Sequence, residues 1–237
     1  RSDGFTISVG ATGFTAGTLN LNRFTQVGST AQALTLTSTG ILNIGPASQF
    51  DGDVTFIAPR VLLNGCTYNG SAYIEKNGAA DDAGTGGNIF NGTTELVNSG
   101  SGYLLSANIT PDIFNGTLTL SNTGSSTIYM AHASAGTQFN GDVIVNSTFG
   151  NGIYFSNNAG GSSTLADTRS LSVGALGFTT GQLRIQRFTQ IGPTSQTLLL
   201  TSVSLLQVGP SSIFNGAVDF RAPRVLLNGC TYNGMTY

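Results

Sequence analysis

Side chains that could carry out acid–base chemistry are scarce in this 237-residue chain. Only 8% of its residues are charged, and it has one histidine. Asp51 and Asp53 are close together in sequence and could stack near Asp142 if the chain coils. Two carboxylates at a defined separation are the requirement for cleaving polysaccharides. A second copy of the first segment has Asn215 and Ala217 at these positions. We therefore expect a protein that is not an enzyme.

Metal-binding patterns are equally weak. Asp81 and Asp82 lie in the Gly-rich stretch "NGAADDAGTGGN", which we expect to loop out of the fold. Two carboxylates fall short of the roughly six to eight oxygen ligands of a calcium site. His132 has no Cys, His or carboxylate at metal-ligand spacing, so we expect a solvated side chain at a turn. The sequence predicts no metal site, no cofactor and no catalytic residue.

The number and distribution of charged residues also limit the possible partners. The net charge is −2 and the nine Lys and Arg residues are scattered, which argues against nucleic acid. No apolar run approaches the roughly 18–20 residues of a membrane-spanning helix. Arg60 and Arg224 occur at equivalent repeat positions, as do Arg23 and Arg187. These guanidinium groups could meet carboxylates or glycans. We favour the alternative that their stems cover coil edges.

A long internal repeat organises the chain. The phrase "APRVLLNGCTYNG" occurs twice without a difference, at 58–70 and 222–234. Residues 8–73 match residues 172–237 at 42 of 66 positions, with a constant offset of 164 and no gap. Residues 8–171 are therefore one unit and 172–237 begin the next. We expect the whole of 1–237 to be a single continuous fold, taken from a longer array.

A shorter period lies inside this unit. An aromatic residue, then Asn or Asp, then Gly recurs through the chain. We interpret the Asn side chains as a hydrogen-bonded ladder along an axis, with the rings stacked inside and the Gly supplying positive φ. The rival interpretation is N-glycosylation, because Asn69, Asn91, Asn108, Asn115 and Asn146 match the acceptor pattern. The predicted ladder residues are Phe50, Asp51, Tyr68, Asn69, Phe90, Asn91, Phe114, Asn115, Phe139, Asn140, Phe214, Asn215, Tyr232 and Asn233.

The elements that would position these residues are short strands. With Phe24, Leu165 and Phe188 as further anchors, the spacings are 26, 18, 22, 24, 25, 26 and 23 residues. Apolar residues alternate after each triplet, as in Val54 and Phe56, and no segment has a helical apolar stripe. This pattern predicts an all-β parallel β-helix, or β-solenoid, of about ten coils with about 18–26 residues each.

Differences between the two copies predict which residues face inward. Asp53, Thr55 and Ile57 become Ala217, Asp219 and Arg221, while the intervening Val and Phe are unchanged. The variable set should face solvent and the invariant set should be buried. Cys66 and Cys230 occupy equivalent positions seven coils apart, about 34 Å at the spacing of parallel strands, so we expect no disulfide between them.

The segments "NIFNGTTELVNSG", "DIFNGTLTLSNTG" and "QFNGDVIVNSTFG", with the flanking "RFTQ" and "APRVLLNG" motifs, resemble repeats of giant surface proteins of Bacteroidetes, including gliding-type adhesins. More loosely, they are similar to filamentous-haemagglutinin and autotransporter β-helices. The resemblance covers essentially the whole chain. It implies a right-handed parallel β-helix, export to the cell surface by the type IX route, and no catalytic residue.

From the resemblance and the repeats we expect the structural stalk or filament of a large extracellular adhesin. Its partners would be adjacent repeats of the same chain, identical rods contacting it laterally or end to end, and surface polysaccharide. Two alternatives remain open. The first is a glycan-binding repeat module, and the second is a polysaccharide-degrading β-helix enzyme.

Overall fold

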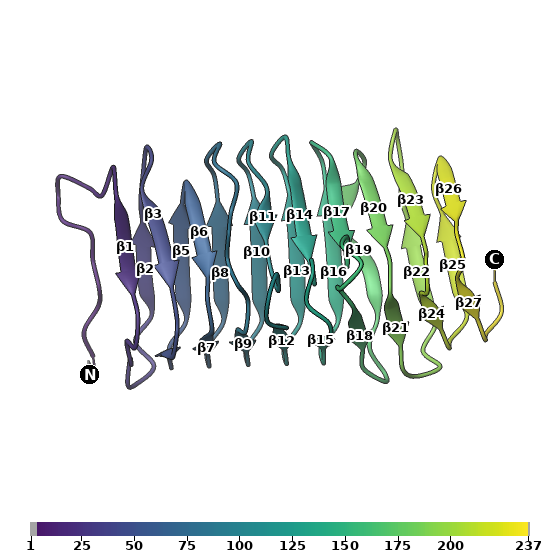
Figure 1. The fold of residues 1–237 in the computed structure, drawn as a ribbon, viewed down its shortest axis with the longest axis horizontal. Coiled ribbons are helices and arrows are strands. Elements are labelled where there is room, and N and C mark those ends of the chain that lie inside the picture. The colour runs from purple at the N-terminus through teal and green to yellow at the C-terminus, as the bar shows by residue number, and fades with distance from the viewer. Residues whose placement is uncertain (1–3, 237) are drawn as a thin grey trace.

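The chain winds as a β-solenoid in the computed structural model, which describes residues 4–236 (Figure 1). Residues 1–3 and Tyr237, which the predicted domain includes, lie outside the described residues. Strands alone make up the regular structure of the described part, in about nine turns where we expected about ten. No helix in residues 4–236 is long and apolar enough to cross a membrane. The expected right-handed winding stays a prediction.

Three walls of parallel strands surround the axis. Wall A is one nine-stranded sheet. Its strands are β2 (Gln32–Thr35), β5 (Val54–Ala58), β8 (Ala72–Lys76), β10 (Thr94–Asn98), β13 (Leu118–Asn122), β16 (Val143–Ser147), β19 (Leu171–Phe178), β22 (Gln196–Leu199) and β25 (Val218–Arg221).

Wall B is split into two sheets of three and six strands. The first holds β1 (Thr18–Leu21), β3 (Ile41–Ile44) and β6 (Arg60–Leu63). The second holds β11 (Leu104–Leu105), β14 (Thr127–Met130), β17 (Gly152–Phe155), β20 (Gln182–Ile185), β23 (Leu205–Val208) and β26 (Arg224–Leu227).

Wall C is a second nine-stranded sheet. It contains β4 (Ser48–Phe50), β7 (Cys66–Tyr68), β9 (Ile89–Phe90), β12 (Ile113–Phe114), β15 (Thr137–Phe139), β18 (Ser163–Leu165), β21 (Phe188–Gln190), β24 (Ile213–Phe214) and β27 (Thr231–Tyr232). Each coil thus contributes one strand to each wall, except at the break in wall B and at the two ends, where wall C and wall A continue only as the single bridges Thr25–Gln49 and Val218–Thr236.

The interruption of wall B corrects one prediction. The Gly-rich stretch around Asp82 does not loop out of the coil; it fills the gap between β6 and β11. The Asp82 amide donates to the carbonyl of Tyr103, and the Gly86 amide donates to the carbonyl of Leu63. Asp82 is only 2% exposed. The segment lacks regular strand pairing, yet it continues the wall and carries a buried carboxylate into it.

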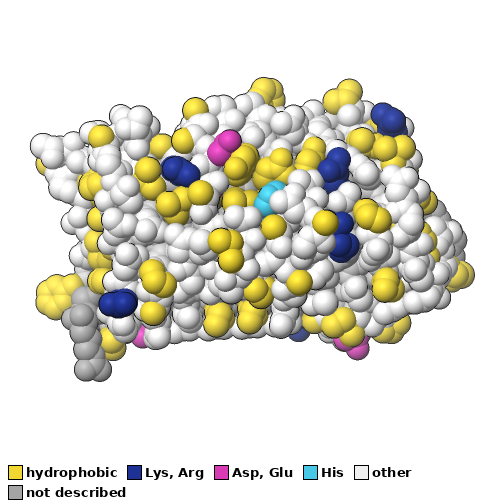
Figure 2. Space-filling view, viewed as in Figure 1, with side chains coloured by type: hydrophobic (Ala, Val, Ile, Leu, Met, Phe, Trp, Pro, Cys, Tyr) yellow, Lys and Arg dark blue, Asp and Glu magenta, His cyan; other side chains and the backbone are white. Residues whose placement is uncertain are grey.

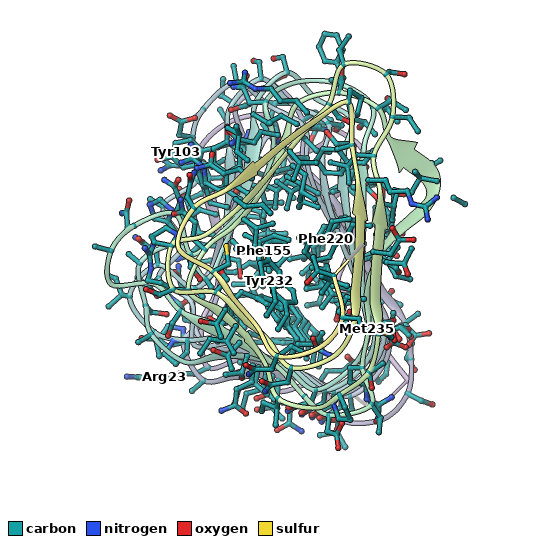
Figure 3. The ribbon with its side chains drawn as sticks, turned by 90° about the vertical axis from the view of Figure 1, so that its right-hand side faces the viewer. Arg23, Tyr103, Phe155, Phe220, Tyr232 and Met235 are labelled. Atoms are coloured by element: carbon teal, nitrogen blue, oxygen red, sulfur yellow. The ribbon has the colours of Figure 1, made fainter. Side chains whose placement is uncertain are left out.

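Strand alternation produces the core. Val54, Phe56 and Ala58 of β5 are buried, whereas Thr55 is exposed and Ile57 is half-buried. The inside–outside assignment made from the two copies is therefore confirmed for this strand. Looking down the axis, Phe155, Phe220 and Tyr232 point into the ring of chain (Figure 3). One continuous apolar cluster runs through the interior, so burial of successive coils against each other is the main stabilising contribution.

The two copies of the repeat fold alike. Strands β20, β22, β23 and β26 have the same bounds as β1, β2, β3 and β6 after the 164-residue offset. Wall A also runs without a break from the first copy into the second, because β16 pairs with β19 and β19 with β22. The sequence repeat is thus a structural repeat seven coils long.

Candidate functional site

An aromatic column runs inside wall C, at the predicted ladder positions. Successive pairs share the same register, and Leu165 takes one place. The rings of Tyr68 and Phe90 lie 4.7 Å apart and those of Phe90 and Phe114 4.8 Å apart, with interplanar angles of 2° in both pairs. This distance equals the spacing of parallel strands, so the backbone pitch sets the stacking. The column consists of Phe50, Tyr68, Phe90, Phe114, Phe139, Leu165, Phe214 and Tyr232.

Two anchors used in the spacing analysis are wrong. Gln190, and not Phe188, pairs with Leu165 in the column. In the first copy, the bridge between Thr25 and Gln49 places Gln26 opposite Phe50. Gln26 therefore stands at the column position, and Phe24 lies two residues before it. The coil lengths remain within 18–26 residues.

Both glutamines are fully buried, and the side-chain amide of each donates a hydrogen bond to a backbone carbonyl of the following turn. The side-chain amide of Gln26 donates to the carbonyl of Thr30, and that of Gln190 donates to the carbonyl of Thr194. The ring of Phe188 still reaches the stack from two residues earlier, 5.8 Å from Phe214. A buried amide and a displaced ring thus occupy the space of one aromatic residue.

The asparagines after the column residues form a hydrogen-bonded ladder. Asn69 donates to Asp51, Asn91 to Asn69, Asn115 to Asn91 and Asn140 to Asn115, at 2.7–2.8 Å. The ladder then stops, since Ala166 and Ile191 follow in the next coils. It resumes where Asn233 donates to Asn215 at 2.6 Å. The Asn side chains inside each row both donate and accept, whereas Asn140 and Asn233 at the row ends only donate.

Glycosylation would compete with this ladder. The acceptor nitrogen Nδ2 is the atom that donates at Asn69, Asn91 and Asn115. Asn146 is only 4% exposed, and its Nδ2 contacts the hydroxyl of Ser121. A glycan at any of these positions would leave Nδ2 a single hydrogen, the one that the existing hydrogen bond needs.

The glycine of each triplet has a different role from the one we expected. None of these glycines in residues 4–236 has positive φ. A Cβ atom on Gly92 would instead lie 2.4 Å from the carbonyl oxygen of Gly70, and one on Gly141 would lie 2.2 Å from that of Gly116. Successive coils approach too closely for any side chain at this corner, which explains the recurrence of glycine.

A second ladder was missed by the sequence analysis. It lies on the outside of wall B, where Asn43 donates to Asn20 at 2.7 Å and Asn64 donates to Asn43 at 2.6 Å. The amide of Thr85 donates to Asn64 and ends the row. The spacings of 23 and 21 residues match the coil length and are the signal that could have revealed it.

Asp51 and Asp53 do not stack near Asp142, the arrangement that a carboxylate pair for polysaccharide cleavage would need. Asp51 accepts hydrogen bonds from Gln49 and Asn69, which lower its pKa. Asp53 caps the amide of Ser71 on the next coil. Asp142 precedes β16, four strand spacings from Asp53 along wall A, about 19 Å. The described residues contain no group of three or more His, Cys, Asp or Glu side chains suited to a metal ion.

The cysteines are both free, as predicted. β7 and β27 stand seven strand spacings apart in wall C, which keeps Cys66 far from Cys230. Burial raises the pKa of the Cys66 thiol to about 12. Because the thiolate is the reactive form, Cys66 behaves as a small apolar core residue.

A buried acid and base lie close to the break in wall B. Lys76 is fully buried and donates to the carbonyl of Gly78 at 2.6 Å. Asp82 accepts from the amide of Val61 through Oδ1, while its Oδ2 is buried and unpartnered. Burial raises the pKa of Asp82 to about 8 and lowers that of Lys76, although each partially offsets the effect on the other.

A row of tyrosines crosses the outside of wall B. The ring of Tyr129 lies 5.3 Å from that of Tyr103 and 5.6 Å from that of Tyr154, edge to face in both cases. The guanidinium of Arg184 lies 4.7 Å above the ring of Tyr154. In Figure 2 this face shows the histidine beside a group of hydrophobic side chains, with cationic side chains on both sides. The row is a rigid aromatic surface.

His132 belongs to this row and is not the solvated residue we expected. It is half-buried, its ring lies 4.9 Å from that of Tyr129, and Nε2 contacts Nδ2 of Asn158 at 3.0 Å. Burial lowers its pKa. His132 lies two residues after the end of β14.

The repeated arginines fit neither expectation completely. The Arg187 guanidinium donates to the carbonyl oxygens of Ser156, Asn158 and Gly161, so it holds the loop of the preceding coil. Arg224 is exposed. Backbone carbonyls, and not carboxylates, are thus the partners of the best-defined guanidinium group.

A shallow groove of about 370 Å³ lies on the outside of wall A, over β5, β8, β10 and β13. Its lining is rich in hydroxyl groups and includes Tyr73, Asp53 and Glu95. Comparisons of the chain with protein families, with curated proteins and with solved structures found no match. The site residues are therefore interpreted from their geometry alone.

Proposed function

We propose that this chain is the rod-forming repeat segment of a large extracellular adhesin-like protein, where it serves as a stiff stalk or filament. The observation that carries the proposal is the structural equivalence of the two repeat copies. Because β20 to β26 repeat β1 to β6 at a constant offset and wall A is continuous between them, further units can extend the same axis. Each 164-residue unit adds seven coils, about 34 Å.

Stiffness follows from the contacts between coils. Every coil is joined to the next by backbone hydrogen bonds in the walls, and many coils are joined also by ring stacking in the aromatic column or by an asparagine ladder. Neighbour-to-neighbour contacts of this kind make stability additive along a repeat protein. The low charge leaves little repulsion between coils. A cell-surface location and identical rods as lateral or end-to-end partners are parts of the same proposal.

The test is the length of an extended chain. A variant in which residues 74–237 are repeated once at the C-terminus should have a maximum dimension about 34 Å greater than the original in small-angle X-ray scattering. The same cross-section is expected for both. A thicker particle or an unchanged length would contradict the rod. Immunogold labelling of intact cells that produce the protein tests the surface location, and sedimentation velocity tests contacts between identical rods.

A further inference from the structure

We propose that the groove on wall A is a binding site for a neutral oligosaccharide. The groove runs parallel to the solenoid axis across four strands, about 14 Å from the first to the last. This length suits a few sugar rings in a row. The site would function whether or not the chain serves as a stalk, so it goes beyond the proposed function.

Two facing columns of polar side chains form its sides. One column consists of the residues just before each strand, namely Asp53, Ser71, Thr93 and Thr117. The other consists of Thr55, Tyr73, Glu95 and Thr119, which are mutual partners in the strand register. Most of these groups are hydroxyls, each able to donate and to accept. A ligand rich in hydroxyl groups satisfies such a lining best.

Several polar atoms of the lining keep bonding capacity for a ligand. Only one oxygen of Asp53 is used, by the amide of Ser71. Only one oxygen of Glu95 is used, by Ser121. The hydroxyls of Ser71 and Thr93 lie 3.0 Å apart, and each retains a further hydrogen-bonding position towards the groove.

Tyr73 provides a rigid ring beside these polar groups. Its phenol donates to Glu75 at 2.7 Å, and Glu75 also accepts from Ser99. The ring is therefore fixed before a ligand arrives, which reduces the entropic cost of binding. Burial and the neighbouring Glu75 raise the pKa of Tyr73, so its proton stays in place.

The negative charge of the groove lining argues against several other classes of ligand. The lining has two carboxylates and no Lys, Arg or His among its described residues. An acidic sugar, a phosphate or a nucleic acid would meet repulsion there. A divalent cation finds no suitable group of ligands. An extended peptide cannot add to the sheet at this point, because β5, β8, β10 and β13 are all paired on both sides.

The second repeat copy suggests a test variant that should keep the fold. Ala217 and Met235 stand there at the positions of Asp53 and Ser71, within the same fold. The double variant Asp53→Ala, Ser71→Met should therefore fold, while it removes two hydrogen-bonding groups from the groove. Tyr73→Ala removes the ring. Tyr154→Ala removes a tyrosine from wall B and serves as the matched control.

The experiment titrates the full chain by calorimetry with cellohexaose, xylohexaose, laminarihexaose and mannohexaose. Hexagalacturonate and a chitosan hexamer are the acidic and cationic comparisons. We expect at least one neutral hexasaccharide to bind, and we expect Tyr73→Ala and the double variant to weaken that binding about tenfold or more. Tyr154→Ala should leave it unchanged. Thermal unfolding of each variant checks that it is folded.

Three outcomes would overturn the proposal. They are no binding of any neutral hexasaccharide at millimolar concentration, binding of the acidic or cationic oligomer alone, and binding that Tyr154→Ala weakens while Tyr73→Ala does not. None of these outcomes affects the rod, which is tested by its length. A failure of this site and a failure of the proposed function are therefore distinguishable.

Discussion

Gly116 lies against Gly92 of the preceding coil so closely that a Cβ atom on Gly116 would be 2.3 Å from the carbonyl oxygen of Gly92. Neither glycine has positive φ. The contact is between two backbones, and no flexible side chain can move to make room. Glycine is thus required here by the spacing of coils and not by the conformation of the turn.

Gly116→Ala should therefore destabilise the fold by about 3 kcal/mol, the upper range for overpacking a well-packed site. Urea unfolding followed by circular dichroism measures the change. Gly10→Ala is the control, because Gly10 has open space around its Cβ position and no positive φ. Its effect should stay within about 0.5 kcal/mol. Equal stability of the two variants would show that coil spacing does not restrict this corner.

Phe114→Ala should cost about 3–5 kcal/mol, because Phe114 is fully buried in the aromatic column and the change leaves a cavity. Phe114→Leu should cost much less, since Leu165 already takes one place in the same column. Phe149 is exposed, and Phe149→Ala provides the control. If Phe114→Ala were no more harmful than Phe149→Ala in urea unfolding, the column would not contribute to stability.

Asn115→Ala removes two bonds of the ladder, one to Asn91 and one from Asn140. These side chains are largely exposed, so water replaces part of what is lost, and we expect a loss of about 1 kcal/mol. Asn77 is exposed and its side chain has no hydrogen bond among the described residues. Asn77→Ala should therefore have almost no effect on the urea midpoint. If the ladder did not contribute to stability, Asn115→Ala and Asn77→Ala would have equal urea midpoints.

The fold could be predicted because the aromatic–Asn–Gly triplets recur once per coil and so reveal the coil length. Asn69, Asn91 and Asn115 are separated by 22 and 24 residues, which are coil lengths, and a solenoid places residues with this spacing in one line. The alternation around Val54 and Phe56 similarly predicted which side is buried. Both signals depend on local spacing, which a single sequence displays directly.

The errors arose where packing between coils decides the structure. Phe24 and Phe188 were taken as column members because they are aromatic, yet the register places buried glutamines there. Asp82 was assigned to a loop because its neighbours are glycines, although backbone bonds to Tyr103 draw it into the wall. The partners of Asp82 lie in the neighbouring coils, so its burial has no local sequence signal. The buried amides of Gln26 and Gln190 bond to carbonyls only four residues further on, but a single glutamine is not distinguished by type from an exposed one.

The tyrosine row on wall B had a signal that the sequence analysis did not use. Tyr103, Tyr129 and Tyr154 are separated by 26 and 25 residues, which are coil lengths. They were considered only as members of apolar runs. The groove on wall A was harder to predict from the sequence, because its hydroxyl-bearing residues resemble the many other exposed Ser and Thr side chains of the chain.

Stability should fall as pH rises from about 4 to about 8, with Asp82 as one cause. Burial raises its pKa to about 8, so between these values the folded state holds a proton that the unfolded state releases. The stabilising contribution is present at acidic pH and is lost as pH rises through the folded pKa. Asp112, whose pKa is also raised by burial, acts in the same direction.

Asp82→Asn separates the contribution of Asp82 to the pH dependence from that of Asp112, because the amide resembles the protonated acid at every pH. The thermal midpoint of this variant should decrease less between pH 5 and pH 8 than that of the unchanged chain. The measurement is differential scanning calorimetry at several pH values. Identical pH profiles for the two proteins would show that Asp82 is not protonated in the fold.

The central claim is that equivalent residues of the two copies lie on one axis, seven coils apart. Thr35 and Leu199 are such a pair, both exposed on wall A, on β2 and β22. Nitroxide labels at Thr35→Cys and Leu199→Cys, in a chain with Cys66→Ala and Cys230→Ala, allow their separation to be measured by pulsed dipolar spectroscopy. A single narrow distribution near about 34 Å is predicted from the strand spacing. A broad distribution, or a distance below about 20 Å, would contradict a continuous stack of seven parallel-strand spacings.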